Sequence, residues 1–354
     1  MEAQLKVRDL QVGFDVFKGH VDVVKLDELS IGRGESYGLV GESGAGKTVL
    51  ALTLLGLLPQ PPAVIHASEM RLGGVDLINM SPKELRAIRG RHIAMIFQDP
   101  MSALDPVYSV RAQMSEVICR RAGVDRAEAF ERILKYMHLV ELPDPETIVH
   151  KYPHQLSGGQ RQRLIIALAL SCGADFLIAD EPTRNLDVTV QASILKTMYR
   201  LRQELEVSML FIANSLALVS AMCDRVGILM RGRLVETGTA RDIVEEPMHP
   251  YTLDLLHAVP RKGEALVDNG VGLTDVDASR SACCHYRRCR SRGPACENTE
   301  ALAMLPVSET HAVACPKAAA ASPAVLAEAA LGLASAPAAT GYRVVQHQSR
   351  RGDT

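Results

Sequence analysis

The chain has 354 residues, and its 39 Lys and Arg residues against 41 Asp and Glu residues give a formal charge of -2. This balance argues against a dedicated nucleic-acid-binding protein, which would carry a strong basic excess. With 47% hydrophobic and 23% charged residues the chain can bury a sizeable core, which excludes wholesale disorder. The absence of Trp and the 4% aromatic content argue against a surface that stacks bases.

No membrane-directed segment is expected. Residues 1–10 mix charged and apolar side chains, which is not the pattern of a signal peptide. No apolar run reaches the roughly 20 residues that a spanning helix needs. The nearest candidate, residues 318–339, is mostly Ala and contains Pro and Glu. We interpret it as part of a disordered tail over residues 317–354, and we expect a soluble protein, or one that reaches a membrane through a partner.

The first forty residues alternate apolar and polar side chains over 4–40, which predicts antiparallel strands and a hairpin. Within this stretch, residues 37–40 predict a short buried strand that runs into a glycine-rich loop. A helix is predicted over 49–58, and helices with charged faces over about 100–155.

Two apolar runs, 176–179 and 209–212, are short enough to be central parallel strands. Residues 225–236 predict two short strands around the pair 231–232. Because strands alternate with helices along the chain, we expect an α/β core.

A glycine-rich motif follows the strand at 37–40 and matches G-x-x-x-x-G-K-[ST]. Its residues are Gly41, Glu42, Ser43, Gly44, Ala45, Gly46, Lys47 and Thr48. In such a loop the backbone N–H groups face phosphate oxygens, the Lys ammonium reaches the β- and γ-phosphates, and the hydroxyl reaches Mg²⁺. The N-terminus of the next helix adds about half a positive charge. The motif therefore predicts a nucleotide triphosphate site.

Two acids, Asp180 and Glu181, close the strand at 176–179. A buried strand end is a costly place for two charges unless a cation or ligand meets them. Alone, the pair would also fit a solvated loop. Together with the phosphate loop, it predicts that Asp180 helps to hold Mg²⁺ and that Glu181 polarises the attacking water.

Between these motifs lies Leu156, Ser157, Gly158, Gly159 and Gln160, followed by Arg-Gln-Arg. An ordinary capped helix could also begin this way. The order of the three motifs, however, resembles that of the ATP-binding-cassette (ABC) ATPases. The resemblance implies that this signature faces the γ-phosphate of an ATP held by a partner subunit.

The resemblance extends to further site residues. Gln98 lies in a stretch that is similar to the family's Gln loop, which contacts the metal or water and links to the membrane subunit. Asp187 is implied to belong to the nucleotide site. Phe14 occupies the place of the aromatic side chain that stacks on adenine, with Phe17 as the alternative, and either could instead be core.

Four stretches resemble the ATPases of oligopeptide/dipeptide importers: 99–106, 152–155, 186–191 and 247–252. This implies a P-loop NTPase fold with an antiparallel β subdomain and a helical subdomain near 100–160. The expected boundaries are a nucleotide-binding domain over 1–240 and a small Cys-containing segment over 241–316, ahead of the tail.

The implied function is the ATP-hydrolysing subunit of a peptide importer, peripheral on the cytoplasmic face of the inner membrane. Its implied partners are a paralogous ATPase forming a heterodimer, two transmembrane permease subunits and, indirectly, an extracytoplasmic solute-binding protein. The alternatives are import of nickel or a metal chelate, a non-hydrolysing regulatory cassette, and a soluble ABC ATPase. The last would need a coiled-coil insertion or two cassettes, which this sequence lacks.

Two positions depart from the family pattern. Asn214 stands where a His is usual, and its amide can neither carry positive charge nor shuttle a proton. Residues 183–185 read Thr-Arg-Asn, where small side chains are common. We hypothesise that the chain's own site is slow or degenerate while its signature completes an active site on the partner; the alternative is that both sites turn over.

Five cysteines crowd the C-terminal region. Cys283, Cys289, Cys296 and Cys315 have a spacing similar to that of importer ATPases that can hold a four-iron, four-sulfur cluster. Four thiolates also suit zinc. Cys284 could replace Cys283, and unmetallated thiols are the remaining alternative.

Overall fold

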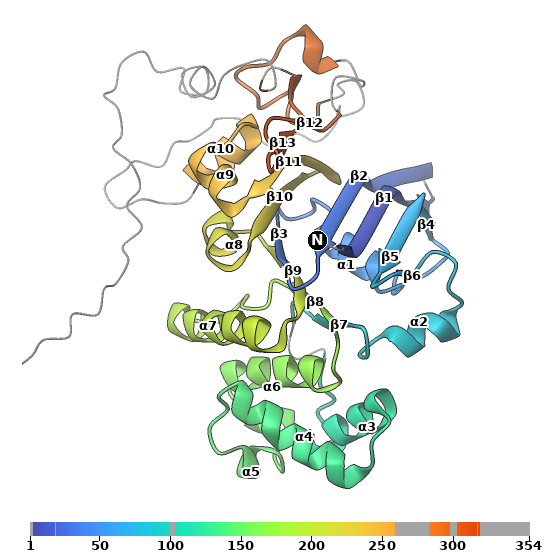
Figure 1. Cartoon of the computed structure of the whole chain (residues 1–354), viewed down its shortest axis with the longest axis vertical. Coiled ribbons are helices and arrows are strands. Elements are labelled where there is room, and N and C mark those ends of the chain that lie inside the picture. The colour runs from blue at the N-terminus through green and yellow to red at the C-terminus, as the bar shows by residue number, and fades with distance from the viewer. Residues whose placement is uncertain are drawn as a thin grey trace, which may run out of the picture.

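The computed structural model describes residues 3–17, 19–99, 103–258, 283–297, 303–316 and 318. A long antiparallel hairpin opens the chain and forms the basis of the first sheet (Figure 1). The strands of this sheet are β1 (Ala3–Val16), β2 (Gly19–Gly32), β4 (Ala63–His66), β5 (Glu69–Leu72) and β6 (Val75–Asp76). The hairpin was predicted from the alternating pattern, and β4 to β6 were not.

Alternation explains why the hairpin packs on one face only. Leu5, Val7, Leu10 and Val12 of β1 are fully buried, whereas Arg8 and Gln11 are exposed. In an extended strand, successive side chains point to opposite faces of the sheet. The alternation shifts by one residue at Asp9, which has a positive φ of 48°, so that Leu10 and Val12 share the buried face with Leu5 and Val7. The buried face lies against α1 (Lys47–Leu54), so that the hairpin covers the helix that follows the phosphate loop.

The second sheet has eight strands. In spatial order they are β12 (Leu305–Pro306), β13 (Ala312–Val313), β11 (Arg233–Thr239), β10 (Arg225–Met230), β3 (Ser36–Val40), β9 (Ser208–Ala213), β8 (Phe176–Asp180) and β7 (Ile93–Ile96). The five strands from β10 to β7 are parallel. Every residue of β3, β8 and β9 is buried, as expected for strands covered on both faces. Because these strands are parallel, their carboxyl ends share one edge, which gathers the predicted catalytic residues.

Helices cover this sheet and extend into a separate layer. Besides α1 they are α2 (Pro82–Ile88), α3 (Val110–Ala122), α4 (Arg126–Leu139), α5 (Pro145–Ile148), α6 (Gly158–Ser171), α7 (Val188–Leu205), α8 (Leu216–Met222), α9 (Ala240–Glu245) and α10 (Pro250–His257). Figure 1 shows α3 to α6 at one end of the molecule and residues 283–297 at the other. None of the described helices is long and apolar enough to cross a membrane.

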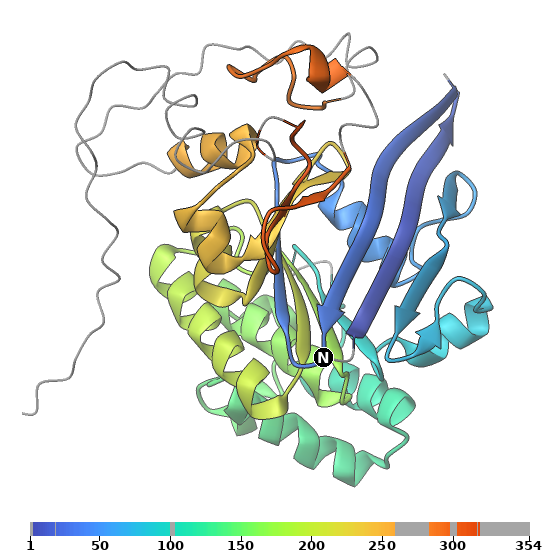
Figure 2. The same ribbon diagram turned by 45° about the horizontal axis from the view of Figure 1, so that its top comes forward.

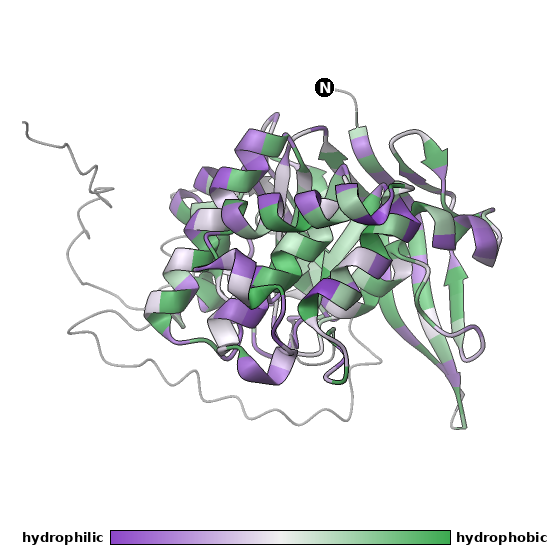
Figure 3. Ribbon diagram, turned by 90° about the horizontal axis from the view of Figure 1, so that it is seen from below, coloured by the Kyte–Doolittle hydropathy of each residue, from purple (hydrophilic) through white to green (hydrophobic). Residues whose placement is uncertain are grey.

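Hydrophobic and hydrophilic residues alternate along the visible helices in Figure 3, where green and purple segments follow one another. In α4, Ala129, Ile133 and Met137 recur every four residues and are fully buried. Asp125 caps this helix by accepting hydrogen bonds from two backbone N–H groups at 2.9 Å. Burial of this apolar face of α4 holds the helix in the helical layer that also contains the signature.

The predicted helix over 49–58 was wrong at both ends. The observed helix begins at Lys47, directly after Gly46, and ends at Leu54. Gly46 and Gly56 both have positive φ, 101° and 59°, which a continuous right-handed helix does not allow.

The C-terminal part of the chain returns to the second, eight-stranded sheet. Strand β13 pairs with β11 at two positions, and β12 pairs with β13 (Figure 2). Of the tail predicted over 317–354, all residues except Ala318 lie outside the described residues.

Candidate functional site

The phosphate loop joins β3 to α1 and is shaped by its glycines. A Cβ at Gly41 would lie 2.2 Å from the carbonyl oxygen of Leu229, so that only glycine fits there. Gly44 has a positive φ of 82° and open space around it. No side chain caps α1, so its first backbone N–H groups remain available to an anion. The loop therefore fits a phosphate group.

Lys47 is buried with its ammonium group surrounded by oxygen atoms. Its Nζ donates to the carbonyl oxygens of Gly41 at 2.7 Å and Glu42 at 3.0 Å, and to Asn214 Oδ1 at 2.8 Å. Burial lowers the pKa of Lys47, while the charge of Glu181 opposes this shift. The ammonium group is thus held inside the loop, where a phosphate oxygen could replace its present partners.

Thr48 and Asp180 face each other across the loop. The Thr48 hydroxyl donates a hydrogen bond of 2.8 Å to Asp180 Oδ2. Asp180 ends β8 with only 2% exposure, and this burial raises the pKa of its carboxyl group, although the Thr48 hydrogen bond opposes the rise. A hydroxyl beside a carboxylate is the oxygen pair that Mg²⁺ takes in nucleotide sites, so these two residues fit the predicted role.

Glu181 receives hydrogen bonds from three side chains. Gln98 Nε2 lies 3.2 Å from Oε2, Asn214 Nδ2 lies 2.5 Å from Oε1, and Arg184 makes an ion pair of 3.0 Å with Oε2. The predicted catalytic residues Gln98, Glu181 and Asn214 are thus brought together. Arg184 is an additional cation, and the sequence signal for it was the unusual Thr-Arg-Asn loop.

The signature lies at the N-terminus of α6. Ser157 caps the helix by accepting from Gln160 N–H at 3.2 Å, and Gln160 Oε1 accepts from Ser157 N–H at 3.0 Å. A Cβ at Gly159 would lie 2.8 Å from Val190 of α7. The polar side chains are therefore used for capping, which leaves the glycine backbone as the surface for a phosphate.

Asp187 lies at the start of a helix, whereas the two predicted adenine-stacking residues, Phe14 and Phe17, lie on the opening hairpin. Asp187 caps α7 by accepting from Val190 N–H at 2.9 Å. Phe14 is half-buried on β1 opposite Val21, and Phe17 at the end of the hairpin is fully exposed. The choice between Phe14 and Phe17 stays a prediction.

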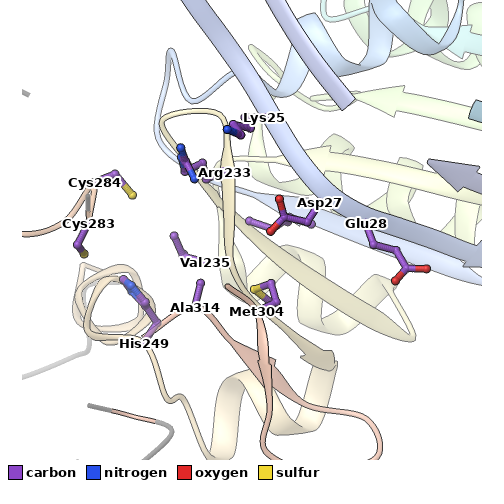
Figure 4. Close-up of a pocket in the computed structure, with 11 residues that line it drawn as sticks. Lys25, Asp27, Glu28, Arg233, Val235, His249, Cys283, Cys284, Met304 and Ala314 are labelled. Carbon is purple, nitrogen blue, oxygen red and sulfur yellow. The ribbon is translucent and has the colours of Figure 1, made fainter. Parts of the chain in front are cut away.

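The cysteine segment forms a small unit at the edge of the main sheet. Cys283 N–H donates to the carbonyl oxygen of Cys296 at 3.1 Å, and Cys289, Cys296 and Cys315 are buried. Burial, followed by weaker effects of neighbouring thiols, raises the pKa of Cys283 and of Cys289 to about 11. Figure 4 shows Cys283 and Cys284 at a hollow that is also lined by His249 and Arg233.

The described residues give no evidence for the predicted metal cluster. Among them, no group of three or more His, Cys, Asp and Glu side chains is arranged to hold a metal ion.

Two residues contact the phosphate loop although the sequence did not predict these contacts. Tyr251 of α10 accepts a hydrogen bond from Glu42 N–H at 3.0 Å, and Arg288 pairs with the Glu42 carboxylate at 2.8 Å. They lie more than 200 residues from the loop in the sequence, and no spacing motif joins them to it.

Comparisons with known proteins agree with this geometry. Residues 24–184 match the ABC transporter family model, and residues 235–296 match the oligopeptide/dipeptide transporter C-terminal region. The chain is 40% identical over 304 residues to the dipeptide transport ATP-binding protein DppD of Bacillus subtilis, covering 84% of this chain and 90% of that protein. It is 40% identical over 269 residues to the oligopeptide transport ATP-binding protein OppD of Escherichia coli, covering 75% and 79%.

The chain belongs to the ABC ATPases of oligopeptide/dipeptide transporters. Among solved structures it is similar to cbiO1 from Clostridium perfringens, part of an ABC transporter complex, with 26% identity, a TM-score of 0.58 and coverage of 72% and 96%. The ATP-binding cassette MJ0796 bound to ADP and Pi shares the fold at 23% identity and a TM-score of 0.58, with coverage of 67% and 99%. As an ABC ATPase, the chain binds ATP with Mg²⁺ and couples ATP hydrolysis to transport.

Proposed function

We propose that this ABC ATPase energises the import of peptides as a peripheral subunit on the cytoplasmic face of the inner membrane. The printed functions of its relatives and the match of residues 235–296 to the oligopeptide/dipeptide C-terminal region support a peptide solute. The observation that carries ATPase chemistry is the convergence of Lys47, Asp180 and Glu181 on one edge of the sheet.

Each residue has a distinct task at this edge. Lys47 exchanges its present oxygen partners for phosphate oxygens and neutralises their charge. Thr48 and Asp180 would hold Mg²⁺, which supplies charge neutralisation when bound. Glu181 orients the attacking water, and Gln98 positions the Glu181 carboxylate through its amide.

We infer further that the two sites of the working dimer are unequal. In this chain Glu181 is held by both Asn214 and Arg184, so that fewer of its lone pairs are free for a water molecule. Asn214 cannot supply the positive charge of the usual His. The glycine backbone at Gly158 and Gly159 is intact and half-buried, so this chain's signature would complete a competent site on a paralogous partner.

The partner permease subunits would dock on the helical layer. A surface hollow of about 820 Å³ lies along α3, and its lining includes Tyr108, Arg111 and Glu116. Phe97, which follows β7, and Val107 and Tyr108, which precede α3, are exposed apolar or aromatic side chains. Gln98, next to Phe97 in the sequence, would link membrane contact to the position of Glu181 through its hydrogen bond to the Glu181 carboxylate.

Reconstitution tests the proposal. The chain is co-purified with its membrane partners, placed in liposomes with a solute-binding protein, and supplied with ATP inside. We expect ATP-dependent uptake of labelled di- or oligopeptides. Uptake of a nickel chelate without peptide uptake would establish the metal alternative, and ATP binding without any turnover would establish a regulatory cassette.

The cysteine cluster carries a separate prediction of a four-iron, four-sulfur cluster or zinc. It is supported by the spacing of Cys283, Cys289, Cys296 and Cys315, which is similar to that of importer ATPases that can hold such a cluster. Anaerobic purification with a visible absorbance scan and metal analysis tests it. A colourless, metal-free protein would establish unmetallated thiols.

A further inference from the structure

Glu42, the second residue of the phosphate loop, makes contacts through its carboxylate, its N–H group and its carbonyl oxygen. Its carboxylate pairs with Arg288, and its N–H donates to the hydroxyl of Tyr251. Its carbonyl oxygen accepts from Lys47 Nζ at 3.0 Å and from Ala45 N–H at 3.1 Å. Glu42 therefore links two distant residues, through its carboxylate and its N–H group, to the ammonium group of Lys47, which its carbonyl oxygen contacts.

Arg288 and Tyr251 belong to one packed unit. The His285 ring is 1% exposed and lies 5.7 Å from the ring of Tyr251 and 5.8 Å from that of His249. Its Nε2 is 3.2 Å from Asp254 of α10. This fixed ring begins the turn that carries the arginine, since Arg288 N–H donates to the carbonyl oxygen of His285 at 3.0 Å.

The same turn lies within residues 283–297, the segment that contains Cys283, Cys289 and Cys296. Cys289, next to Arg288, also donates its N–H to the His285 carbonyl oxygen, at 2.9 Å. Movement of this segment would therefore displace the guanidinium group from Glu42. The hydroxyl of Tyr251 would move with it, because His285 packs against the Tyr251 ring.

We propose that residues 283–297 act as a brace on the phosphate loop, in which Arg288 and Tyr251 are positioning residues that hold Glu42 and thereby preset the loop for ATP. The brace stands outside the catalytic residues and acts through Glu42 alone. It concerns nucleotide binding and does not depend on which solute is transported. Because coupling between two sites is reciprocal, bound ATP should in turn steady the segment.

A double-mutant cycle tests the brace. We would measure the Kd of a fluorescent methylanthraniloyl derivative of ATP for the full chain and for Arg288→Ala, Glu42→Gln and the double variant. The Arg288–Glu42 pair is partly solvated, with side-chain exposures of 24% and 49%, so we expect each single variant to bind roughly 2- to 5-fold more weakly. The double variant should be no weaker than the weaker single one.

The chain offers a matched control. Arg132 pairs with Glu128 on α4 at 2.7 Å, with exposures of 36% and 49%, far from the loop in the sequence. Arg132→Ala should leave the Kd unchanged, and Arg288→Lys should recover part of the affinity. Wild-type affinity in Arg288→Ala, or losses that multiply in the double variant, would overturn the proposal.

Hydrogen exchange gives a readout that a purely structural role would not move. Bound ATP without Mg²⁺ should slow amide exchange across 283–297 in the wild type and should not do so in Arg288→Ala. Equal slowing in both proteins would also overturn the brace. Tyr251→Phe provides an independent variant, because it removes the acceptor of Glu42 N–H while keeping the ring packing, and we expect an affinity loss of about 5-fold or more.

Discussion

Asn214 accepts a hydrogen bond of 2.8 Å from the ammonium group of Lys47 and donates one of 2.5 Å to Glu181. A single amide thus connects the phosphate-binding cation to the residue that would orient water. An amide can satisfy both charges through its oxygen and its nitrogen, whereas a protonated imidazole would repel Lys47. The neutral amide therefore satisfies the hydrogen bonds observed without nucleotide, but it does not supply the positive charge that would favour catalysis.

Replacing Asn214 by His should raise turnover at this chain's own site. The imidazole can carry the positive charge that the amide lacks, and we expect a gain of roughly 10-fold or more. The measurement is ATP hydrolysis in the assembled complex with the partner subunit's phosphate loop disabled. Asn214→Ala serves as the control and should not show a gain. An unchanged rate in Asn214→His would mean that the amide is already sufficient.

Replacing Lys47 by Ala should abolish useful ATP binding and lower hydrolysis at this site by about 100-fold or more. The folded protein should survive, because burial of the ammonium group already lowers its pKa and is a cost to the fold. Equilibrium nucleotide binding and thermal unfolding without nucleotide measure the two effects. Retained ATP affinity would contradict the assignment of this loop.

Asp180→Asn should separate stability from activity. Burial raises the pKa of Asp180, so its stabilising contribution is complete below the unfolded pKa near 3.8 and is lost as pH rises through the folded value. At neutral pH the charged carboxylate therefore destabilises the folded protein. Without nucleotide, the Asp180→Asn variant should unfold at a higher temperature than the wild type. Its half-maximal Mg²⁺ concentration in the ATPase assay should rise by about 10-fold or more. A lower unfolding temperature would show that the carboxylate stabilises the fold.

The docking of the C-terminal strands should depend on pH. His311 Nε2 lies 2.7 Å from the buried Glu236, and although burial lowers the pKa of His311, this hydrogen bond and the Glu236 charge raise it above 6.5 overall. The stabilisation is complete below pH 6.5 and is lost as pH rises through the folded value. The difference in Tm between wild type and His311→Gln should therefore be larger at pH 6 than at pH 9. A constant difference would exclude this titration.

Local patterns predicted those parts of the fold whose information is local. The alternation in residues 4–40 predicted the long hairpin, which is observed over residues 3–32, and the apolar runs predicted β8 and β9. The G-x-x-x-x-G-K-T motif placed the phosphate loop between a strand and a helix, as observed. In each case a side-chain period or a glycine conformation restricts the backbone within a few residues.

Contacts across the fold were not predictable in this way. Strand β13 adds only two paired residues to β11, too few to leave a pattern. The Arg184–Glu181 pair required the turn in which Glu181 adopts a positive φ of 45°. Arg288 reaches Glu42 only because α10 and His285 place it there. Such relations depend on tertiary packing rather than on sequence spacing.

The return of residues 312–313 to β11 has a practical consequence for shortened chains. A protein ending at residue 258 would lack β12 and β13, and would leave part of the outer margin of β11 without its hydrogen-bonding neighbour. An unpaired strand edge can form hydrogen bonds with a strand of another molecule, which leads to aggregation. Glu236, which lies fully buried in β11, would also lose its His311 partner and would keep only its hydrogen bonds from Met248 N–H, His249 N–H and the Thr252 hydroxyl. Expression of the isolated cassette should therefore include residues through 318 to remain in solution.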